Sequence, residues 1–267
     1  MTTPQLSACI IACNEERDLS RCLESIAFAD EIVVVVDDRS TDATEKLALE
    51  AGARVELHPY EGNVEQKNVA LALTTGEWVL SLDADEAVTP ELAEQVRAAL
   101  ERGDAGAVGF ELNRITWHLG RWIRHGEFYP DWQLRLFRRS AGRWEGENPH
   151  GRVEVTGPVR RLDGELEHYS YRDLADQVDR IQDFSRIQAV GYRAAGRPVR
   201  VVADLVLRPP LRFLRAYLVK QGFRDGVPGF IIAAATAFHV FLKYAKLWES
   251  ERLGTTEGRA SGKPGRD

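Results

Sequence analysis

The sequence predicts an α/β fold, with a mainly parallel sheet flanked by helices and a helical extension after it. Over the first 100 residues, short apolar runs alternate with segments whose apolar residues recur at helical spacing. The connections are short and polar, which is typical of strand and helix units that build a parallel sheet. Two of the strand-like runs end in paired acids, so we expect a ligand site at the carboxyl edge of that sheet.

Four segments have the character of strands. Residues 6–12, 32–36 and 78–82 are apolar runs, and a shorter segment follows the second of them. Such runs are too short for typical helices and suit strands that are covered on both faces. The predicted strands are 6–12, 32–36, 54–57 and 78–82.

The segments between these strands carry helix signals. Apolar residues at 19, 22, 23 and 26 follow acids at 15, 16 and 18, which suit a helix N-terminus. The Ser, Thr and Asp cluster at 40–44 predicts the start of a second helix, and Gly52 its end. A third helix is expected over 64–73, and Pro90 marks the first position of a fourth.

Paired acids follow two of the predicted strands. Asp83-Ala84-Asp85 ends the run 78–82, and Asp37-Asp38 ends the run 31–36. Carboxylates at the mouth of a sheet can bind a divalent cation and the phosphates it carries. The chain has neither a G-x-G-x-x-G after its first strand nor a G-x-x-x-x-G-K-[ST], so a dinucleotide fold and a P-loop NTPase lose their main support. A phosphatase with an aspartate nucleophile stays open, although Glu86 stands where a hydroxyl residue would be expected soon after.

The charges are divided unevenly along the chain. Residues 1–100 contain 7 Lys and Arg against 20 Asp and Glu, a net −13, whereas residues 101–267 contain 28 against 21, a net +7. The acidic part suits a cation site, and the basic part suits an anionic partner.

The three cysteines predict a reducing compartment. Cys9, Cys13 and Cys22 form no C-x-x-C pair and have no histidine at zinc-site spacing, so we expect buried, reduced thiols. This points to the cytoplasm. No signal peptide is expected, because the apolar run 6–12 leads directly into polar residues.

Four motifs in register resemble a known family. Ala12-Cys13-Asn14-Glu15, the segment 36–42, Gln66-Lys67-Asn68 and Asp83-Ala84-Asp85 resemble the family 2 glycosyltransferases of the GT-A fold. The segments 121–124, 129–131, 134–139 and 168–171 are similar to the subgroup that adds sugars to the lipopolysaccharide inner core. The resemblance implies a metal-dependent, inverting transfer of a hexose from a nucleotide sugar, with UDP-glucose expected, to a glycolipid acceptor.

The resemblance also implies roles for individual residues. Asp38 would bind the nucleotide base, and Asp83 would face the ribose. Asp85 would hold Mg²⁺ or Mn²⁺ bridging the diphosphate, where a cation stabilises the charge of the departing nucleoside diphosphate. The nucleoside and diphosphate would be surrounded by Asn14, Glu15 and Lys67.

Simpler interpretations of these residues stay open. Asn14 and Glu15 could cap the first helix, and Asp42 could start the second one. Lys67 could be an ordinary solvated helix lysine.

Inverting transfer needs a base for the proton of the acceptor hydroxyl. Asp131 stands where the family usually carries an acidic base ahead of an arginine, here Arg135. The alternatives are Glu145, Glu147 and His150, and each of the acids could equally be a solvent-facing loop residue. Relatives tend to carry glutamate after this histidine, whereas this chain has Gly151, so a role for that glutamate is not transferable.

The last third of the chain changes character. Ser170-Tyr171-Arg172-Asp173 has a capping-box pattern, and a long helix to about residue 195 is expected after it. Residues 193–224 hold eight Lys and Arg against the single acid Asp204, interleaved with apolar residues. Such a stretch suits an anionic membrane surface, whereas no nucleic-acid module is recognisable. Residues 230–242 form an apolar segment of about 13 residues, short of the ~20 that cross a bilayer, so we expect a buried or interfacial helix.

The expected organisation is a catalytic domain over 1–168, a basic amphipathic helical region over 169–253 and a disordered tail over 254–267. The expected protein is cytoplasmic and peripheral on the inner face of the membrane. Two other functions use the same residues: a nucleotidyltransferase or phosphatase, and a non-catalytic module that binds a nucleotide sugar or a lipid.

Overall fold

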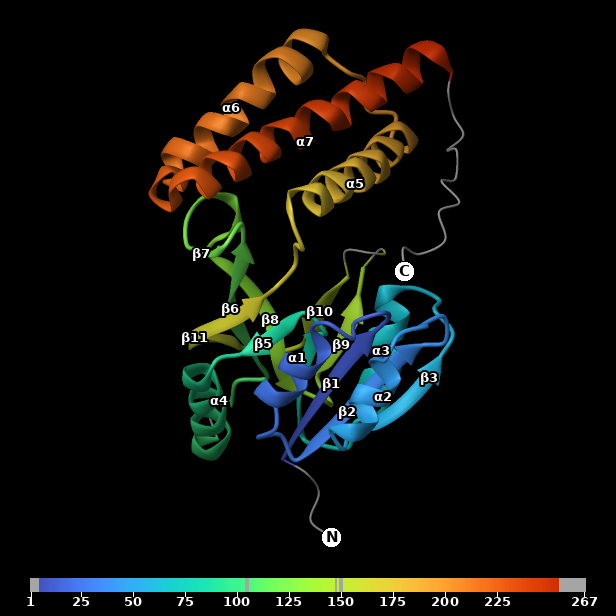
Figure 1. Ribbon diagram of the computed structural model, residues 1–267, viewed down its shortest axis with the longest axis vertical. Helices are drawn as coiled ribbons and strands as arrows, with labels where there is room; N and C mark the ends of the chain where they lie inside the picture. The colour runs from blue at the N-terminus through green and yellow to red at the C-terminus, as the bar shows by residue number, and fades with distance from the viewer. Residues whose placement is uncertain (1–4, 104–105, 147, 149–150, 255–267) are drawn as a thin grey trace. The chain divides into compact units, whose positions relative to one another are not determined.

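The computed structural model describes residues 5–103, 106–146, 148 and 151–254 (Figure 1). The predicted tail over 254–267 therefore lies outside the described residues except for Gly254, and Glu147 and His150 lie outside them too. The chain divides into two compact units. Among the described residues, the sheet unit comprises those within 5–115 and 131–169, and the helical unit comprises 116–130 and 170–254. This division places 116–130 with the helices, whereas the sequence suggested a single boundary after 168.

The sheet unit is built on four parallel strands in the order β3-β2-β1-β4. β1 begins and ends where the sequence predicts, and the other three extend the predictions by one residue or two. The predicted α/β fold with a parallel sheet is therefore confirmed. The bounds are β1 Leu6–Ala12, β2 Glu31–Asp37, β3 Arg54–His58 and β4 Trp78–Asp83.

Antiparallel strands continue the sheet beyond β4. β8 pairs with β4 and with β6, and β11 pairs with β5. A separate hairpin is formed by β9 and β10, and the end of β6 pairs with β7 within the helical unit. The bounds are β5 Glu86–Val88, β6 Gly109–His118, β7 Arg121–Ile123, β8 Asp131–Arg138, β9 Gly142–Glu145, β10 Arg152–Val155 and β11 Val159–His168.

Four helices accompany this sheet, and the sequence signals explain their bounds. They are α1 Leu19–Ser25, α2 Thr44–Glu50, α3 Asn63–Leu73 and α4 Pro90–Arg102. The hydroxyl of Thr89 accepts a hydrogen bond from Leu92 N and caps α4, whose first position is proline. Asp42 Oδ1 accepts from Thr44 N, the first residue of α2, at 3.0 Å, although the N-cap of this helix is Ala43.

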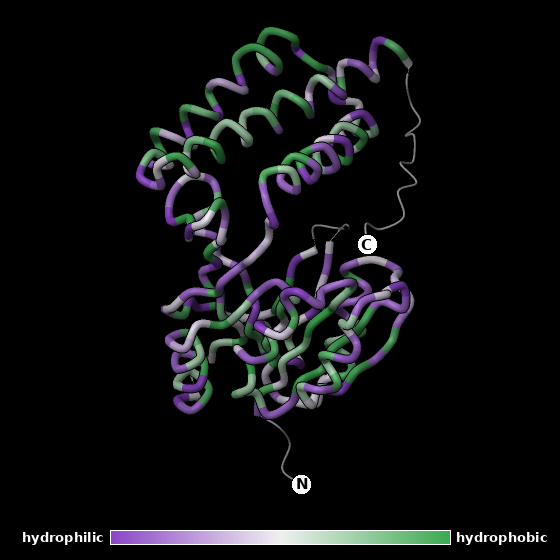
Figure 2. The backbone as a smooth tube through the Cα atoms, in the orientation of Figure 1, coloured by the Kyte–Doolittle hydropathy of each residue, from purple (hydrophilic) through white to green (hydrophobic). Residues whose placement is uncertain are grey.

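Two apolar clusters cover the two faces of the parallel strands. Ala8 and Ile10 of β1 belong to the cluster that contains α1 and α4 side chains, whereas Cys9 belongs to the cluster with α3 and the β9–β10 hairpin. β2 divides in the same way, with Val34 facing one cluster and Val33 the other. Figure 2 shows the hydrophobic strands at the centre of this unit. Burial on both faces explains why these strands are continuously apolar.

The cysteine prediction is correct for two of the three thiols. Cys9 and Cys22 are buried, and burial raises the pKa of Cys9 to about 11. Cys13 is exposed, so its predicted burial is wrong. The reason is local, because β1 ends at Ala12 and Cys13 already belongs to the loop.

The helical unit contains three long or medium helices joined by shorter helical turns. α5 runs over Leu174–Ala194 and ends where the sequence predicts. Its N-cap is Asp173, whose carboxylate accepts from Asp176 N at 2.8 Å, so the capping box expected at Ser170 is wrong. The remaining elements are η2 Gly126–Phe128, η3 Val201–Leu207, α6 Arg208–Leu214, η4 Arg215–Val219, η5 Gly222–Asp225 and α7 Gly226–Leu253.

The final helix is much longer than the apolar segment suggested. α7 has 28 residues, so the expectation of a short helix of about 13 residues is wrong. The segment Gly222–Leu253 has the length and apolar composition to cross a membrane, and 22% of its most apolar window is buried. Core helices of soluble proteins meet the same criteria, so length and composition alone do not place α7 in a bilayer.

Candidate functional site

The carboxyl edge of the parallel sheet collects most of the predicted donor-site residues. Asn14 follows β1, Asp38 follows β2, and Asp83 is the last residue of β4. Because these strands are parallel neighbours, their ends meet at one edge, as the sequence predicts. Asp85 lies in the turn between β4 and β5.

Two cations hold Asp83. Lys67 Nζ of α3 lies 2.5 Å from Asp83 Oδ1, and Arg135 Nη2 of β8 lies 2.6 Å from Oδ2. The ammonium of Lys67 also lies 4.0 Å from the ring centroid of Trp144, a buried residue of β9. Lys67 is itself buried, so the interpretation as a solvated helix lysine is wrong.

A buried carboxylate extends this pair of contacts into a network. Glu86 Oε1 accepts from Arg135 Nη2 at 2.7 Å and from Arg114 Nη1 at 3.0 Å. Arg114 in turn lies 2.7 Å from Asp131, the predicted base. The charge network, meaning Lys67, Asp83, Arg135, Glu86, Arg114 and Asp131, therefore alternates in sign and carries three positive and three negative groups.

The network keeps the carboxylate of Asp83 ionised. Burial opposes the ionisation of Asp83, but the charges of Lys67 and Arg135 outweigh it and hold the pKa of Asp83 far below its ordinary value. Burial also disfavours the charged form of Arg135, yet Glu86 and Asp83 raise its pKa above the ordinary value. Neutralisation by neighbours is what allows these ionised groups to be buried.

Asp85 is the residue that could hold a cation. Its Oδ2 lies 3.4 Å from His168 Nε2 of β11, and its backbone carbonyl accepts from Tyr169 N at 2.9 Å. Burial opposes its ionisation, but the hydrogen bond and charge of His168 lower the pKa of Asp85 overall. An ionised carboxylate is a suitable ligand for a divalent cation such as Mg²⁺.

Within the described residues, no group of three or more His, Cys, Asp and Glu is placed to hold a metal by itself. Mg²⁺ that binds together with a substrate is commonly held by one or two carboxylates, substrate phosphates and water. The residues around Asp85 therefore fit a cation that binds together with a diphosphate.

Asn14 connects the loops that follow β1 and β2. It has a φ of 55°, and its side-chain oxygen accepts from Thr41 N at 2.9 Å. Its backbone N–H donates to Ser40 Oγ at 3.0 Å, and Glu15 N donates to Thr44 Oγ1 at 2.7 Å. The interpretation of Asn14 and Glu15 as helix caps is wrong, because α1 begins only at Leu19.

The predicted base-recognition residue stands apart from the charge network. Asp38 is exposed, and its backbone N–H donates to His58 O at 3.4 Å. The preceding Asp37 is buried and pairs with Arg39 at 2.5 Å. The side chain of Asp38 therefore faces solvent at the sheet edge, where a bound nucleotide could reach it.

The four candidates for the catalytic base differ in their surroundings. Asp131 begins β8, and it accepts from Arg114 Nε at 2.8 Å and from Gln133 Nε2 at 2.6 Å. Glu145 is an exposed residue at the end of β9 and takes no part in the charge network. Glu147 and His150 lie outside the described residues. Among the described candidates, the structure connects only Asp131 to the donor-site carboxylates.

Gly151 occupies the position where the resemblance leads one to expect glutamate. A Cβ atom built on Gly151 would lie 2.4 Å from Cγ2 of Val64, far inside contact distance. Val64 is a buried residue in the first turn of α3, packed in the same cluster as Trp144. In this chain valine therefore fills the space that a side chain at 151 would need.

Sequence reasoning assigned no role to four residues of this site: Glu86, Arg114, Arg135 and His168. Arg114 and Arg135 lie in strands rich in apolar residues, and charged residues at buried strand positions indicate ion partners elsewhere in the chain. The sequence therefore indicates that these arginines have acidic partners. It does not identify the partners, which lie on β4 and β5.

Comparison with known proteins identifies a sequence family and several similar proteins. Residues 7–163 match the sequence family described as Glycosyl transferase family 2. The lipopolysaccharide core biosynthesis glycosyltransferase LpsC of Rhizobium meliloti is 33% identical over 260 residues, which are 93% of each chain. An uncharacterized glycosyltransferase of Rickettsia conorii is 27% identical over 93% of this chain and 91% of its own. The crystal structure of S. aureus TarS in complex with UDP-GlcNAc matches 94% of this chain and 92% of that one, with 17% identity and a TM-score of 0.47.

Proposed function

This chain belongs to glycosyl transferase family 2, and we propose that it transfers a hexose from UDP-glucose, with inversion, to a glycolipid of the lipopolysaccharide core. As a glycosyltransferase it is neither a nucleotidyltransferase nor a phosphatase, although the same carboxylates raised both possibilities. The acceptor class comes from the name of the relative from Rhizobium meliloti.

One observation supports the proposed donor-binding site. Asp83 at the end of β4 is held by Lys67 and Arg135, while Asp85 two residues later keeps an ionised carboxylate beside His168. This arrangement offers a diphosphate one cationic side chain from the protein and one carboxylate for a metal. Asn14, Glu15 and Asp38 lie on the loops after β1 and β2, where the nucleoside would bind.

The residues present fit a divalent cation, Mg²⁺ or Mn²⁺, which would be held by Asp85 with His168 as its neighbour. Such a cation supplies charge stabilisation to the departing nucleoside diphosphate without proton transfer. Lys67 contributes a further positive charge on the protein side of the same group.

Asp131 is proposed to accept the proton of the attacking acceptor hydroxyl. As that oxygen bonds to the anomeric carbon, the bond between this carbon and the diphosphate oxygen breaks, and the nucleoside diphosphate leaves with the electron pair. The hydrogen bonds from Arg114 and Gln133 fix the orientation of the Asp131 carboxylate. Glu145, Glu147 and His150 stay alternatives for this role.

The place of reaction is proposed to be the inner face of the cytoplasmic membrane, where the protein binds peripherally. The proposal is supported by the excess of Lys and Arg in residues 193–224 and by the apolar residues exposed among them, such as Leu211 and Leu218.

Calorimetric titration tests the donor site. Purified protein is titrated with UDP, GDP, CDP, ADP and dTDP, with and without Mn²⁺, alongside Asp85→Ala and the control Glu94→Ala, an exposed acid of α4. We expect UDP to bind in a metal-dependent manner, and we expect Asp85→Ala but not Glu94→Ala to abolish that dependence. Binding that ignores both the metal and Asp85 would contradict the proposed site.

A further inference from the structure

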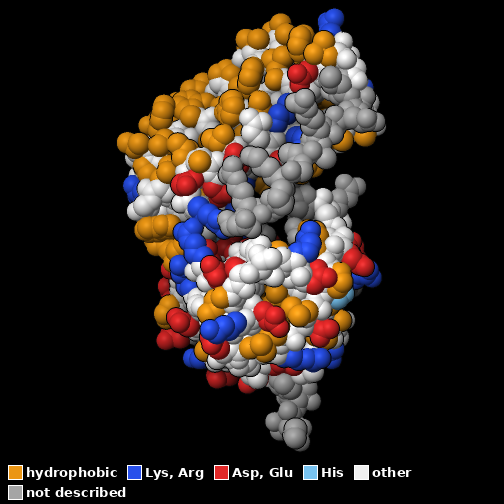
Figure 3. Space-filling view, turned by 45° about the vertical axis from the view of Figure 1, so that its right-hand side comes forward, with side chains coloured by type: hydrophobic (Ala, Val, Ile, Leu, Met, Phe, Trp, Pro, Cys, Tyr) orange, Lys and Arg blue, Asp and Glu red, His pale blue; other side chains and the backbone are white. Residues whose placement is uncertain are grey.

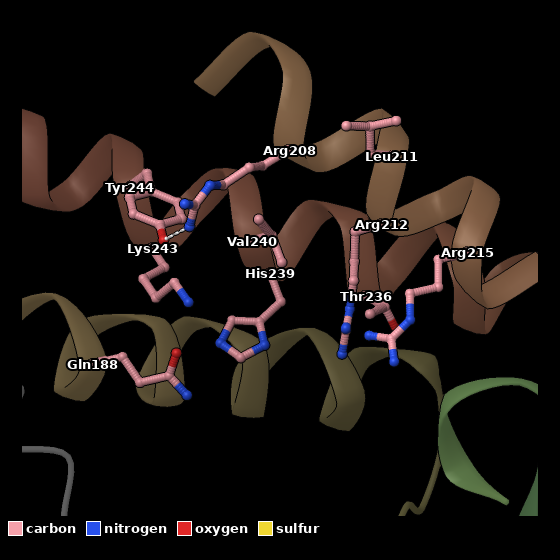
Figure 4. Close-up of a pocket in the computed structure, with 10 residues that line it drawn as sticks. All are labelled: Gln188, Arg208, Leu211, Arg212, Arg215, Thr236, His239, Val240, Lys243 and Tyr244. Atoms are coloured by element: carbon pink, nitrogen blue, oxygen red, sulfur yellow. Dashed lines mark hydrogen bonds between the residues drawn. The ribbon is translucent and has the colours of Figure 1, made fainter. Parts of the chain in front are cut away.

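The helical unit contains a cavity of about 510 Å³ (Figure 4). Its walls come from three helices, with Gln188 on α5, Arg208 and Arg212 on α6, and His239 and Lys243 on α7. Figure 4 shows the side chains of Arg212, His239 and Lys243 extending toward α5. The cavity lies entirely within residues of the helical unit.

The lining of this cavity is strongly basic. It contains Arg208, Arg212, Arg215 and Lys243, and no aspartate or glutamate. Arg208 and Arg212 have acidic partners outside the lining, since Arg208 lies 2.8 Å from Asp204 and Arg212 lies 2.7 Å from Glu127. Among the described residues, Arg215 and Lys243 form no ion pair of this kind, so two positive charges face the cavity without a partner carboxylate.

Two buried nitrogens at this cavity also need hydrogen-bond partners. Nε of Arg212 and Nε2 of His239 are inaccessible to solvent and have no partner among the described residues. Burial, followed by the charges of Lys243 and Arg212, lowers the pKa of His239. Unpaired buried nitrogens are costly, and an acceptor in the cavity would satisfy the Nε–H of Arg212.

The surroundings of the cavity are apolar. Leu211 lines it and is 60% exposed. Figure 3 shows hydrophobic side chains gathered over the helical unit. Exposed apolar residues on and around α6 and α7 include Leu207, Leu214, Leu218, Val219, Phe238 and Phe241. A basic cavity bordered by exposed apolar side chains matches a ligand with an anionic head and apolar chains.

We propose that this cavity binds the phosphate group of an anionic lipid, with the acyl chains lying along the apolar surface of α6 and α7. Arginine guanidinium groups suit phosphate because they donate parallel hydrogen bonds to its oxygens. Basic pockets between helices are known places for lipid head groups. The inference rests on the membrane association in the proposed function and adds a defined head-group site to it.

Vesicle flotation tests the site with two matched double variants. Arg215→Gln with Lys243→Gln removes the two cations that lack carboxylate partners, whereas Arg224→Gln with Arg252→Gln removes two exposed cations outside the lining. The probes are phosphatidylcholine vesicles with and without phosphatidic acid. Circular dichroism establishes that both doubles keep their helices.

We expect the cavity double to lose at least about tenfold more affinity for phosphatidic acid vesicles than the control double, because it loses direct charge-assisted hydrogen bonds. Equal losses in the two doubles would overturn the cavity site while leaving general membrane association intact. A wild-type protein that floats with neither kind of vesicle would overturn both.

A second measurement separates a lipid from free phosphate. The pKa of His239 is followed by NMR in the presence of short-chain phosphatidic acid or of inorganic phosphate. We expect the lipid to raise this pKa at far lower concentration than phosphate does, because the anion lies near the ring and the chains add apolar contacts. Equal affinity for both would assign the cavity to free phosphate and overturn the lipid assignment, and an unchanged His239 would exclude both.

Discussion

Arg135 Nη2 lies 2.7 Å from Oε1 of Glu86, and both side chains are buried. The same nitrogen lies 2.6 Å from Asp83, so Arg135 joins the donor-site carboxylate to the interior of the sheet unit. Through Glu86 the contacts continue to Arg114 and Asp131. Asp83 of the predicted donor site and the predicted base Asp131 are thus held by one continuous set of ion pairs.

Replacing Glu86 should destabilise the protein. Glu86→Gln keeps the side-chain shape but removes one of three negative charges, which leaves an uncompensated positive charge among buried groups. Breaking a buried pair in this way costs about 3 kcal/mol or more. Urea unfolding measures the loss, and Glu77→Gln is the control, because Glu77 pairs with Arg138 in an exposed position and should cost under about 1 kcal/mol. A loss for Glu86→Gln no larger than that of the control would contradict the importance of the network.

Replacing Lys67 should weaken donor binding. Lys67→Met retains the apolar stem beside Trp144 but removes the charge proposed to contact the diphosphate. Losing one hydrogen bond to a charged group costs about 1.5–3 kcal/mol, which is about tenfold to hundredfold in the Kd for UDP. Calorimetry measures this change. The control is Lys46→Met, because Lys46 is an exposed residue of α2. Unchanged UDP affinity in Lys67→Met would remove Lys67 from the donor site.

The lowered pKa of Asp83 predicts a loss of stability in acid. Because the folded pKa lies below the unfolded value of about 3.9, the contribution of Asp83 is complete above that value. It is lost as the pH falls through the folded pKa. The contribution of Asp83 to the free energy of unfolding should therefore be constant from pH 7 to about pH 5 and decrease below that pH. Thermal unfolding of the wild type and of Asp83→Asn measures this, and the variant should show a shallower decline in acid. Parallel curves would mean that Asp83 is not held as described.

Removing the proposed base should impair transfer and leave donor binding intact. Asp131→Asn should lower kcat by about 10²–10⁴-fold, the usual contribution of general base catalysis. Glu145→Gln is the comparison, because Glu145 is exposed and lies outside the charge network. Transfer of radiolabelled hexose to the glycolipid fraction measures kcat, and calorimetry with UDP verifies the donor site. If Glu145→Gln lowers kcat and Asp131→Asn does not, Glu145 and not Asp131 is the catalytic base.

Peripheral membrane binding should be reversible by salt. At about 1 M salt the Debye length falls to ~3 Å, so attraction between the basic stretch and anionic lipids is screened. Membranes from expressing cells are washed at low salt, at high salt and with alkaline carbonate, and we expect release by high salt. Retention through carbonate would indicate that α7 crosses the bilayer. Complete recovery in the soluble fraction at low salt, without vesicle binding, would contradict membrane association.

The elements of the parallel sheet could be predicted well from the sequence. β1, β2 and β4 are buried on both faces, so their apolar runs have clear ends where polar loop residues begin. Their common direction also follows from the alternation with helices, and parallel strands have their carboxyl ends at one edge of the sheet. The sequence accordingly predicts that Asn14, Asp38 and Asp83 lie at that edge, as they do in the structure.

The incorrect predictions of helix ends have physical explanations. Ser170 and Asp173 both carry side chains that can cap a helix, and only the observed hydrogen bond to Asp176 N distinguishes them. The length of α7 is greater than the sequence predicts, because the prediction covers only the continuously apolar residues 230–242. The helix continues over 243–253, where charged residues alternate with the buried Tyr244 and Leu247.

The charge network could not be predicted because its contacts join distant parts of the chain. Glu86, Arg114 and Arg135 come from β5, β6 and β8, and nothing in their local sequence connects them. The burial of a charged residue depends on its partners. Such partners become visible only when the sheet order is known.

The close approach of Val64 to Gly151 restricts the sequence history open to this chain. A glutamate is not accommodated at position 151 while valine stands at position 64, because its Cβ would collide with a stiff, β-branched side chain in the first turn of α3. Val64 would have to become smaller first, and only then could a larger residue be accepted at 151. A substitution at position 64 must therefore precede the introduction of a larger residue at position 151.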